Sequence, residues 1–209
     1  LEHVPRYHTW MKNPALLEAT GSEPLSMEEE IAMQRSWRDD PHKCTFIVHA
    51  AQSIDAGDDR MPMVQFDVKD NLASMVGDVN LFLSEMEDED EEEECNKSRK
   101  DEGPRLQAEI DIMIAEKDWQ GKGIGKEATC AMMLYGATNL GIRRFFCKIN
   151  EDNMASLSLF KSLGFEQCNY AECFKQVELE MMEPLATLRE RLELLGAYRE
   201  VPCPVDDES

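Results

Sequence analysis

The sequence predicts an α/β fold in which a single domain is built around a mixed sheet. A length of 209 residues is common for one domain of this class. The second half of the chain alternates segments of strand and helix periodicity, which is the order of elements that such a sheet requires. Hydrophobic residues make up 42% of the chain, and no apolar run approaches the roughly 18 residues of a membrane span. We therefore expect a soluble domain with a sizeable core.

The first half of the chain is expected to contribute two helices and two strands. Uneven helical spacing of apolar residues predicts one helix from Val4 to Glu18. Ser26 and Glu29 have the spacing of a capping box, so a second helix is expected over Met27 to Arg38. Two β-rich runs follow, and they are expected to form the strands Cys44 to Ala50 and Met75 to Leu83.

An acidic segment interrupts the domain. Nine of the ten residues from Glu85 to Glu94 are acidic, and a like-charge block of this density repels itself and resists folding into a core. We interpret residues 85–104 as a disordered loop, with a cation site or a docking strip for a basic partner as the alternatives. Residues 1–183 are then expected to form the domain, and residues 184–209 a C-terminal helix and an acidic tail.

Six elements are expected after the acidic segment, in the order strand, helix, strand, helix, strand, strand. Isoleucines at alternate positions mark the first strand, and apolar residues at helical spacing mark the long helix behind it. A glycine follows each helix and is expected to end it. The expected bounds are Arg105 to Ala115, Gly121 to Leu140, Arg144 to Ile149, Met154 to Leu163, Phe165 to Ala171 and Phe174 to Met181.

The formal net charge of −21 limits the classes of partner. Nucleic acids and anionic membranes are not expected, because neutralising phosphates needs clustered Lys and Arg, and basic partners are favoured instead. The seven cysteines are odd in number and form no CxxC pair, and the four histidines show no metal-ligand spacing. Neither a disulfide framework nor a metal site is therefore expected. Reduced thiols are typical of the cytoplasm and the nucleus, and we expect a cytoplasmic protein that can also be nuclear.

A glycine-rich segment lies between the first strand and the long helix of the second half. Unpaired amides and the helix dipole favour an anion at such a junction, and glycines let a pyrophosphate approach closely. A P-loop does not fit, because only three residues separate Gly121 from Gly125, and a Rossmann fingerprint would have a small residue where Lys126 stands. An incidental glycine-rich turn is the alternative. The candidate residues are Gln120, Gly121, Lys122, Gly123, Ile124, Gly125 and Lys126.

Two motifs in this half of the chain resemble those of a known family. Gln120-x-x-Gly123-x-Gly125 after a strand is similar to the coenzyme A pyrophosphate loop of the GNAT superfamily of acetyltransferases. One helix and one strand further on, the run that begins Asn150-x-x-Asn153 looks like the family's second cofactor motif. The amino-acid sequences of several other stretches resemble those of the N-acetyltransferase 9-like branch of the superfamily, which is near the bacterial ribosomal-protein acetyltransferases.

The resemblance implies the GNAT fold, in which two central strands splay apart, and acetyl-CoA as the cosubstrate. In the family, backbone amides of the strand before the loop hold the pantetheine arm and the thioester carbonyl. The matching positions here are Met113 and Ala115, with Ile114 between them. Asn153 and Ser156 are expected to contact the cofactor, with a plain helix cap as the alternative reading of Asn153.

The resemblance also implies a general base and exposes a departure. Lysine-acetylating members keep their base eleven positions before the loop glutamine, where this chain has Glu109. Asp111 is the alternative base, because strand alternation places it on the same face as Glu109. Many members protonate the leaving thiolate with a tyrosine, and Phe160 stands there instead. Tyr170 is a candidate substitute, with core packing as its other explanation. Family members open with a strand before the first helix, and we expect the sheet of this chain to lack it.

The implied function is the transfer of an acetyl group from acetyl-CoA to a protein N-terminus or a lysine, by direct attack in a ternary complex. The acceptor is expected to be a basic protein or peptide. Two alternatives stay open. One is a catalytically weak binding protein of the same fold that uses the acidic loop for its partners, and the other is an acetyltransferase of small-molecule amines.

Overall fold

The structure is a computed structural model that describes residues 1–50, 72–86, 105–182, 188 and 200 of the chain. Residues 87–104 of the predicted acidic loop lie outside the described residues, as does most of the predicted C-terminal helix and tail. Glu85, the first residue of that predicted loop, belongs instead to a strand. Leu188 is buried against the main core.

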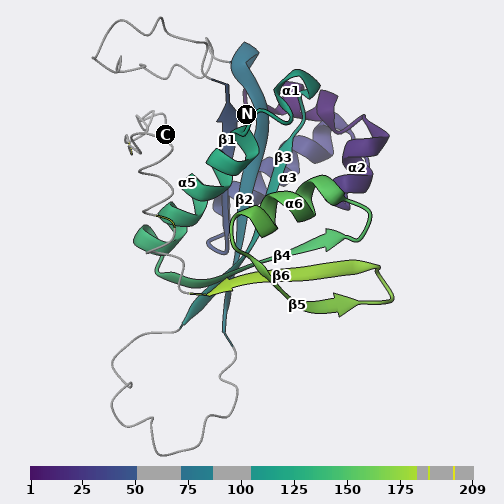
Figure 1. The fold of residues 1–209 in the computed structure, drawn as a ribbon. Helices are drawn as coiled ribbons and strands as arrows, with labels where there is room; N and C mark the ends of the chain where they lie inside the picture. Colours follow the sequence, from purple (N-terminus) through teal and green to yellow (C-terminus); the bar gives the residue numbers. More distant parts are fainter. Residues whose placement is uncertain (51–71, 87–104, 183–187, 189–199, 201–209) are drawn as a thin grey trace, which may run out of the picture.

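The described strands form one mixed sheet of six strands (Figure 1). Their order is β1-β2-β3-β4-β6-β5; β3 and β4 run parallel, and the other neighbouring pairs are antiparallel. The order of elements predicted after the acidic segment is confirmed. The strands are β1 (Lys43–His49), β2 (Met75–Glu85), β3 (Leu106–Ile114), β4 (Ile142–Asn150), β5 (Glu166–Ala171) and β6 (Gln176–Met182).

Two short helices replace the single helix that was predicted over residues 4–18. They are α1 (Val4–Trp10) and α2 (Pro14–Thr20). Asn13 is the N-cap of α2, where its side-chain oxygen accepts the Ala15 N–H at 3.1 Å. Pro14 occupies the first helical position, where a missing N–H costs no helical hydrogen bond. The prediction is wrong because the apolar spacing continues through this Asn-Pro signal for a new helix.

The other predicted helices that lie within the described residues are confirmed. α3 (Met27–Asp39) starts with the expected capping box, in which Ser26 Oγ accepts the Glu29 N–H and a Glu29 carboxylate oxygen accepts the Ser26 N–H. α5 (Ile124–Asn139) follows β3, and α6 (Met154–Ser162) follows β4. Two short 3₁₀ turns are also present, η1 (Leu72–Ser74) and η3 (Lys117–Trp119).

Helices cover both faces of the sheet (Figure 1). α5 and α6 pack on one face over the larger apolar core, which includes the fully buried Leu81 and Phe145. α1 and α2 pack on the other face over a smaller cluster that includes Trp10 and Met113. Since side chains alternate along a strand, β3 contributes Ile110 to the first core and Met113 to the second.

The parallel strands β3 and β4 separate partway along their length. They pair from Leu106 opposite Ile142 to Glu109 opposite Phe146, and the pairing ends there, although both strands continue for several residues. The splayed central strands that the family resemblance implies are thus confirmed. The carboxyl ends of β3 and β4 form the two arms of an open V.

Candidate active site at the splayed strands

A cavity of about 500 Å³ lies at the open end of this V. The arms of β3 and β4 form two of its walls, and the glycine-rich loop, α6 and α2 form the others. A volume in this range suits a small ligand, and the carboxyl ends of parallel strands are a common place for one. The described residues that the sequence placed in two separate motifs therefore meet at one cavity.

The glycine-rich loop that lines the cavity has backbone amides without a backbone acceptor among the described residues. Gly121 and Gly123 have left-handed conformations, with φ of 71° and 87°, and a Cβ added at either would meet no heavy atom within 4 Å. Glu127 N–H donates to Gly123 O at 3.0 Å, and among the described residues the amides of residues 121–126 have no backbone acceptor. Open amides at the positive end of a helix dipole are a ready site for an anion.

Two other residues hold the loop in place. Gln120 Nε2 donates to Ile114 O at 2.7 Å and thereby ties the loop to the end of β3. Gly125 lets α5 approach α6, because a Cβ there would lie 3.2 Å from Leu159 Cδ1. The loop is therefore fixed against both the strand before it and the helix after the next strand.

The lysines of the loop differ in their surroundings. Lys126 lines the cavity together with Gln120 and the glycines of the loop. Lys122 does not, and its Nζ lies 4.9 Å from the centre of the Trp119 ring, within range of a cation–π contact. Ile124 is also absent from the described lining of the cavity. Of the seven residues predicted for this loop, five reach the cavity.

The amide of Ala115 is not available to a ligand, which corrects the sequence prediction. Its N–H donates to Val76 O at 2.8 Å and so extends the ladder between β2 and β3. Amides in an antiparallel strand point alternately to one side and the other, and the register shows no shift through Met113. Met113 N–H therefore points to β2 as well, and the Ile114 N–H points to the open side of the V.

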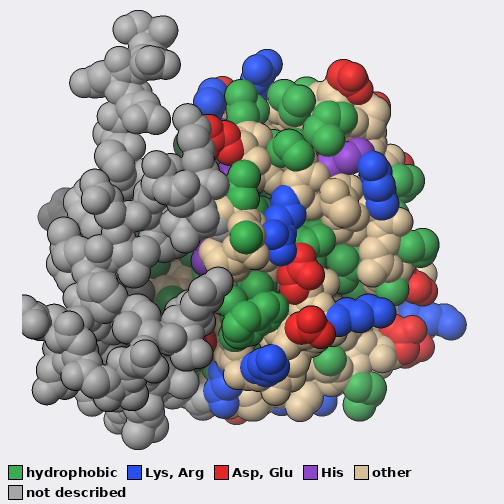
Figure 2. All heavy atoms as spheres, turned by 90° about the horizontal axis from the view of Figure 1, so that it is seen from above, with side chains coloured by type: hydrophobic (Ala, Val, Ile, Leu, Met, Phe, Trp, Pro, Cys, Tyr) green, Lys and Arg blue, Asp and Glu red, His purple; other side chains and the backbone are tan. Residues whose placement is uncertain are grey.

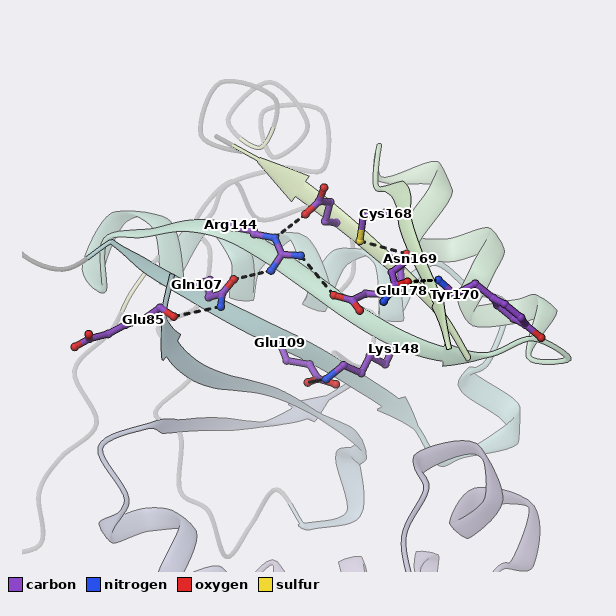
Figure 3. Close-up of polar contacts among 10 residues, drawn as sticks. Glu85, Gln107, Glu109, Arg144, Lys148, Cys168, Asn169, Tyr170 and Glu178 are labelled. Carbon is purple, nitrogen blue, oxygen red and sulfur yellow. Dashed lines mark hydrogen bonds and ion pairs between the residues drawn. The ribbon is translucent and has the colours of Figure 1, made fainter. Parts of the chain in front are cut away.

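The two candidate bases lie on one face of β3 in different environments, and Figure 3 shows Glu109 beside Lys148. Glu109 is paired with a cation, since Lys148 Nζ of β4 lies 3.1 Å from its Oε2, and Glu109 is absent from the described lining of the cavity. Asp111 lines the cavity. Burial raises the pKa of the Asp111 carboxyl, a hydrogen bond from the Ile112 amide opposes the rise, and the charge of Glu109 adds to it.

The second motif places two polar residues at the cavity. Asn153 is the N-cap of α6, and its Oδ1 accepts the Ser156 N–H at 3.1 Å. Both residues line the cavity. The helix cap predicted as the plain alternative for Asn153 is present, and it leaves the amide nitrogen of the side chain free of the cap for other contacts.

The structure places no tyrosine among the described residues that line the cavity. Phe160 lies there instead, 2% exposed and in edge contact with the Phe165 ring at 5.0 Å. Tyr170 is exposed on β5, and its hydroxyl donates to Glu151 Oε2 at 2.6 Å. The predicted core packing of Tyr170 is therefore wrong, and its hydroxyl is held outside the described cavity wall.

Sequence reasoning missed the contribution of α2. Leu16, Ala19 and Thr20 line the cavity, and Asn150 Nδ2 at the end of β4 donates to Glu18 O at 3.3 Å. The helix start at Asn13 could have separated α2 from α1. No local pattern could have placed it beside a strand more than a hundred residues later.

Comparison with known families shows to which family the chain belongs. The family model of the acetyltransferase (GNAT) domain matches residues 1–166. The chain belongs to the GNAT family of acetyltransferases. This GNAT protein is accordingly an acyltransferase. The comparison supports the enzyme and not the alternative of a binding protein.

Related proteins place the chain within a branch of the GNAT family. It is 43% identical over 180 residues to an N-acetyltransferase 9-like protein of Nematostella vectensis, an alignment that covers 86% of this chain and 77% of the relative. It is 42% identical over 181 residues to the human alpha/beta-tubulin-N-acetyltransferase 9, covering 86% and 75% of the two chains. The resemblance to the N-acetyltransferase 9-like branch is confirmed.

Solved structures support the fold. Spermidine N-acetyltransferase from Vibrio cholerae, in complex with CoA and spermine, superposes with a TM-score of 0.61 at 17% identity. The superposition covers 89% of this chain and 92% of that one. At this identity the likeness shows the fold alone.

One face of the described part of the GNAT protein is mixed in character (Figure 2). Figure 2 shows basic and acidic side chains interleaved over the described part of the face seen from above. None of the helices in the described ranges is both long and apolar enough to cross a membrane. Within those ranges no group of three or more His, Cys, Asp and Glu side chains is placed to hold a metal ion.

Proposed function

We propose that this GNAT enzyme transfers the acetyl group of acetyl-CoA to the amine of a protein. One observation carries the proposal: a glycine-rich loop whose amides have no backbone acceptor among the described residues lines a cavity at the point where β3 and β4 separate. The anion and the reactive end of one elongated ligand would then be bound within the same V.

The residues present fit acetyl-CoA. The amides at Gly121 and Gly123, with Lys126 beside them, suit a pyrophosphate, since nothing occupies the space in front of either glycine. The Ile114 N–H points into the gap and suits a carbonyl oxygen. Asn153 and Ser156 offer polar contacts from the opposite wall.

Acetyl-CoA supplies the activated acetyl group as a thioester. A protein α-amine, with a pKa of about 7.7 to 8.0, is mostly protonated at neutral pH and must lose a proton before its lone pair can attack. We assign that proton to Asp111, because its carboxyl lines the cavity while the Glu109 carboxylate is ion-paired with Lys148 and is absent from the described lining. The nitrogen then forms the amide as the carbon–sulfur bond breaks. The second proton that the nitrogen loses as the amide forms passes through water to the departing thiolate, because Phe160 has no proton to give.

The acceptor is proposed to be a protein N-terminus. Relatives at about 40% identity carry names that specify tubulin, and the net charge of −21 favours an acceptor segment that is locally cationic. Small amines are the second candidate, on the basis of fold likeness to the spermidine enzyme alone.

The loop assignment is tested with a matched pair of glycine variants. Gly123→Glu places a carboxylate among the open amides, whereas Gly141→Glu puts the same side chain at an equally left-handed glycine with open space at the far end of α5. Acetyl-CoA should raise the melting temperature of wild type and Gly141→Glu and leave Gly123→Glu unchanged. An equal shift in both variants would contradict the assignment.

The acceptor is tested by mass spectrometry. Wild-type enzyme and acetyl-CoA are incubated with tubulin dimers or with spermine, and the acetylated products are mapped. An acetylated tubulin N-terminus with unmodified spermine supports the proposal. Acetylation of spermine alone would replace it with the small-amine alternative.

A further inference from the structure

A second carboxyl is buried behind Asp111. Asp78 of β2 is 3% exposed, and Asn80 on the same strand is 4% exposed. Asn80 Nδ2 donates to Asp78 Oδ2 at 2.6 Å, and no cation is within ion-pair distance of Asp78 among the described residues. A buried carboxylate without a cation is costly, and such a group usually holds a proton instead.

Hydrogen-bond accounting points the same way. Asp78 Oδ1 and Asn80 Oδ1 are both buried without a hydrogen-bond partner. Both atoms are acceptors, so the pair lacks a donor. A proton on the Asp78 carboxyl supplies that donor and converts one of the two unsatisfied atoms from an acceptor into an O–H group.

The sheet register brings this pair to the proposed base. Asn80 lies directly opposite Asp111, and Asp78 lies opposite Met113, so the three polar side chains share one face of β2 and β3. Asp111 reaches the cavity, while Asp78 and Asn80 are absent from its described lining. Of the two carboxyls, that of Asp111 therefore faces the cavity and that of Asp78 faces the protein interior.

The charged and titratable groups near the pair are mainly acidic. Burial raises the pKa of Asp78 to about 7, the hydrogen bond from Asn80 opposes the rise, and the charge of Asp111 adds to it. Burial raises the pKa of Tyr7 on α1, and the charges of Asp78, Glu30 and Asp111 add to that rise. The groups facing this region are Tyr7 and His8 of α1, Glu30 of α3, Glu109 and Asp111 of β3, and Lys148 of β4.

We propose that Asp78 is a positioning residue for Asp111: the buried Asp78 carboxyl holds a proton, so that Asp111 stays ionised and can accept a proton from the amine. This assignment rests on the proposed function of Asp111. Two carboxyls on one face whose environments differ in this way divide the roles of acid and base between them. The proton on Asp78 stays in place through the reaction, and the proton from the amine leaves Asp111 for solvent.

The proton is located by carbon-13 NMR titration of aspartate-labelled protein without substrate. Wild type should show one buried aspartate that titrates near neutral pH, and Asp78→Asn should remove that titration while the Asp111 signal remains. Asp111→Asn should keep it and lower its midpoint by about one pH unit, because a like charge is lost. Asp39→Asn, an exposed control, should leave both signals unchanged. The proposal is overturned if wild type shows no titration near neutral pH, or if that titration persists in Asp78→Asn.

Activity provides the second readout. Asp78→Asn mimics the protonated carboxyl and should keep kcat at pH 7 within about threefold of wild type, whereas Asp78→Ala removes the partner of Asn80 and should lower it about tenfold. An unchanged thermal shift with acetyl-CoA shows that each variant is folded. Equal losses in both variants contradict the proposal. If wild type releases no free thiol, the proposed function fails, while the NMR titration still decides which carboxyl holds the proton.

Discussion

The two faces of β3 differ in what their residues do. On the face toward α5, Ile110 lies in the main core and is 2% exposed. On the opposite face, Glu109 is paired with Lys148 and Asp111 faces the cavity. Apolar burial contributes in proportion to area, whereas the effect of each carboxyl depends on its particular neighbours. Substitutions on the first face should therefore change stability, and substitutions on the second should change activity.

The largest expected effect belongs to the cavity face. Asp111→Asn removes the proposed base and should lower kcat/KM by about 10² to 10⁴, the usual range for a general base. Glu109→Gln should lower it by less than about tenfold, because that carboxylate is already engaged by Lys148 outside the cavity wall. The measurement is the release of free thiol from acetyl-CoA. Reversal of the two losses would return the role of base to Glu109.

The core face should respond in stability. Phe145 is fully buried beneath α5, and Phe145→Ala should lower the free energy of unfolding by about 3 to 5 kcal/mol. The matched variant Phe46→Ala, at a phenylalanine of β1 that is 47% exposed, should cost much less because water already reaches its ring. Urea denaturation followed by circular dichroism measures both. Similar losses in the two variants would show that the apolar core is not organised as described.

Local sequence signals predicted much of the fold. Alternation in β3, the helical spacing behind it and the glycines that end the helices were sufficient to order the elements after the acidic segment. The capping box at Ser26 placed the start of α3 to the residue. These signals work because they report hydrogen bonds and side-chain directions within a few residues of each other. The two cofactor motifs were likewise found because each lies within one strand-to-helix junction.

The features that sequence could not decide depend on contacts between distant segments. The choice between Glu109 and Asp111 turns on Lys148, which is about forty positions away and was not singled out by any motif. The direction of the Ala115 amide depends on its ladder partner Val76. The buried state of Asp78 follows from the packing of α1 and α3 over β2, and one acidic residue in an apolar run gave no sign of it.

The smallest expected effect concerns how pH acts on the two faces. The pKa of Asp78 in the folded protein, about 7, lies above the ordinary aspartate value of 3.8 in the unfolded chain. The folded state therefore binds this proton more tightly, and the resulting stability is fully present below about pH 4 and is lost as the pH rises through about 7. Asp111 is shifted in the same direction. We expect the free energy of unfolding of wild type to fall between these pH values, by about 3 kcal/mol more than that of Asp78→Asn. Urea denaturation of both proteins at a series of pH values measures the difference, and parallel curves would show that Asp78 is ionised in the folded protein throughout.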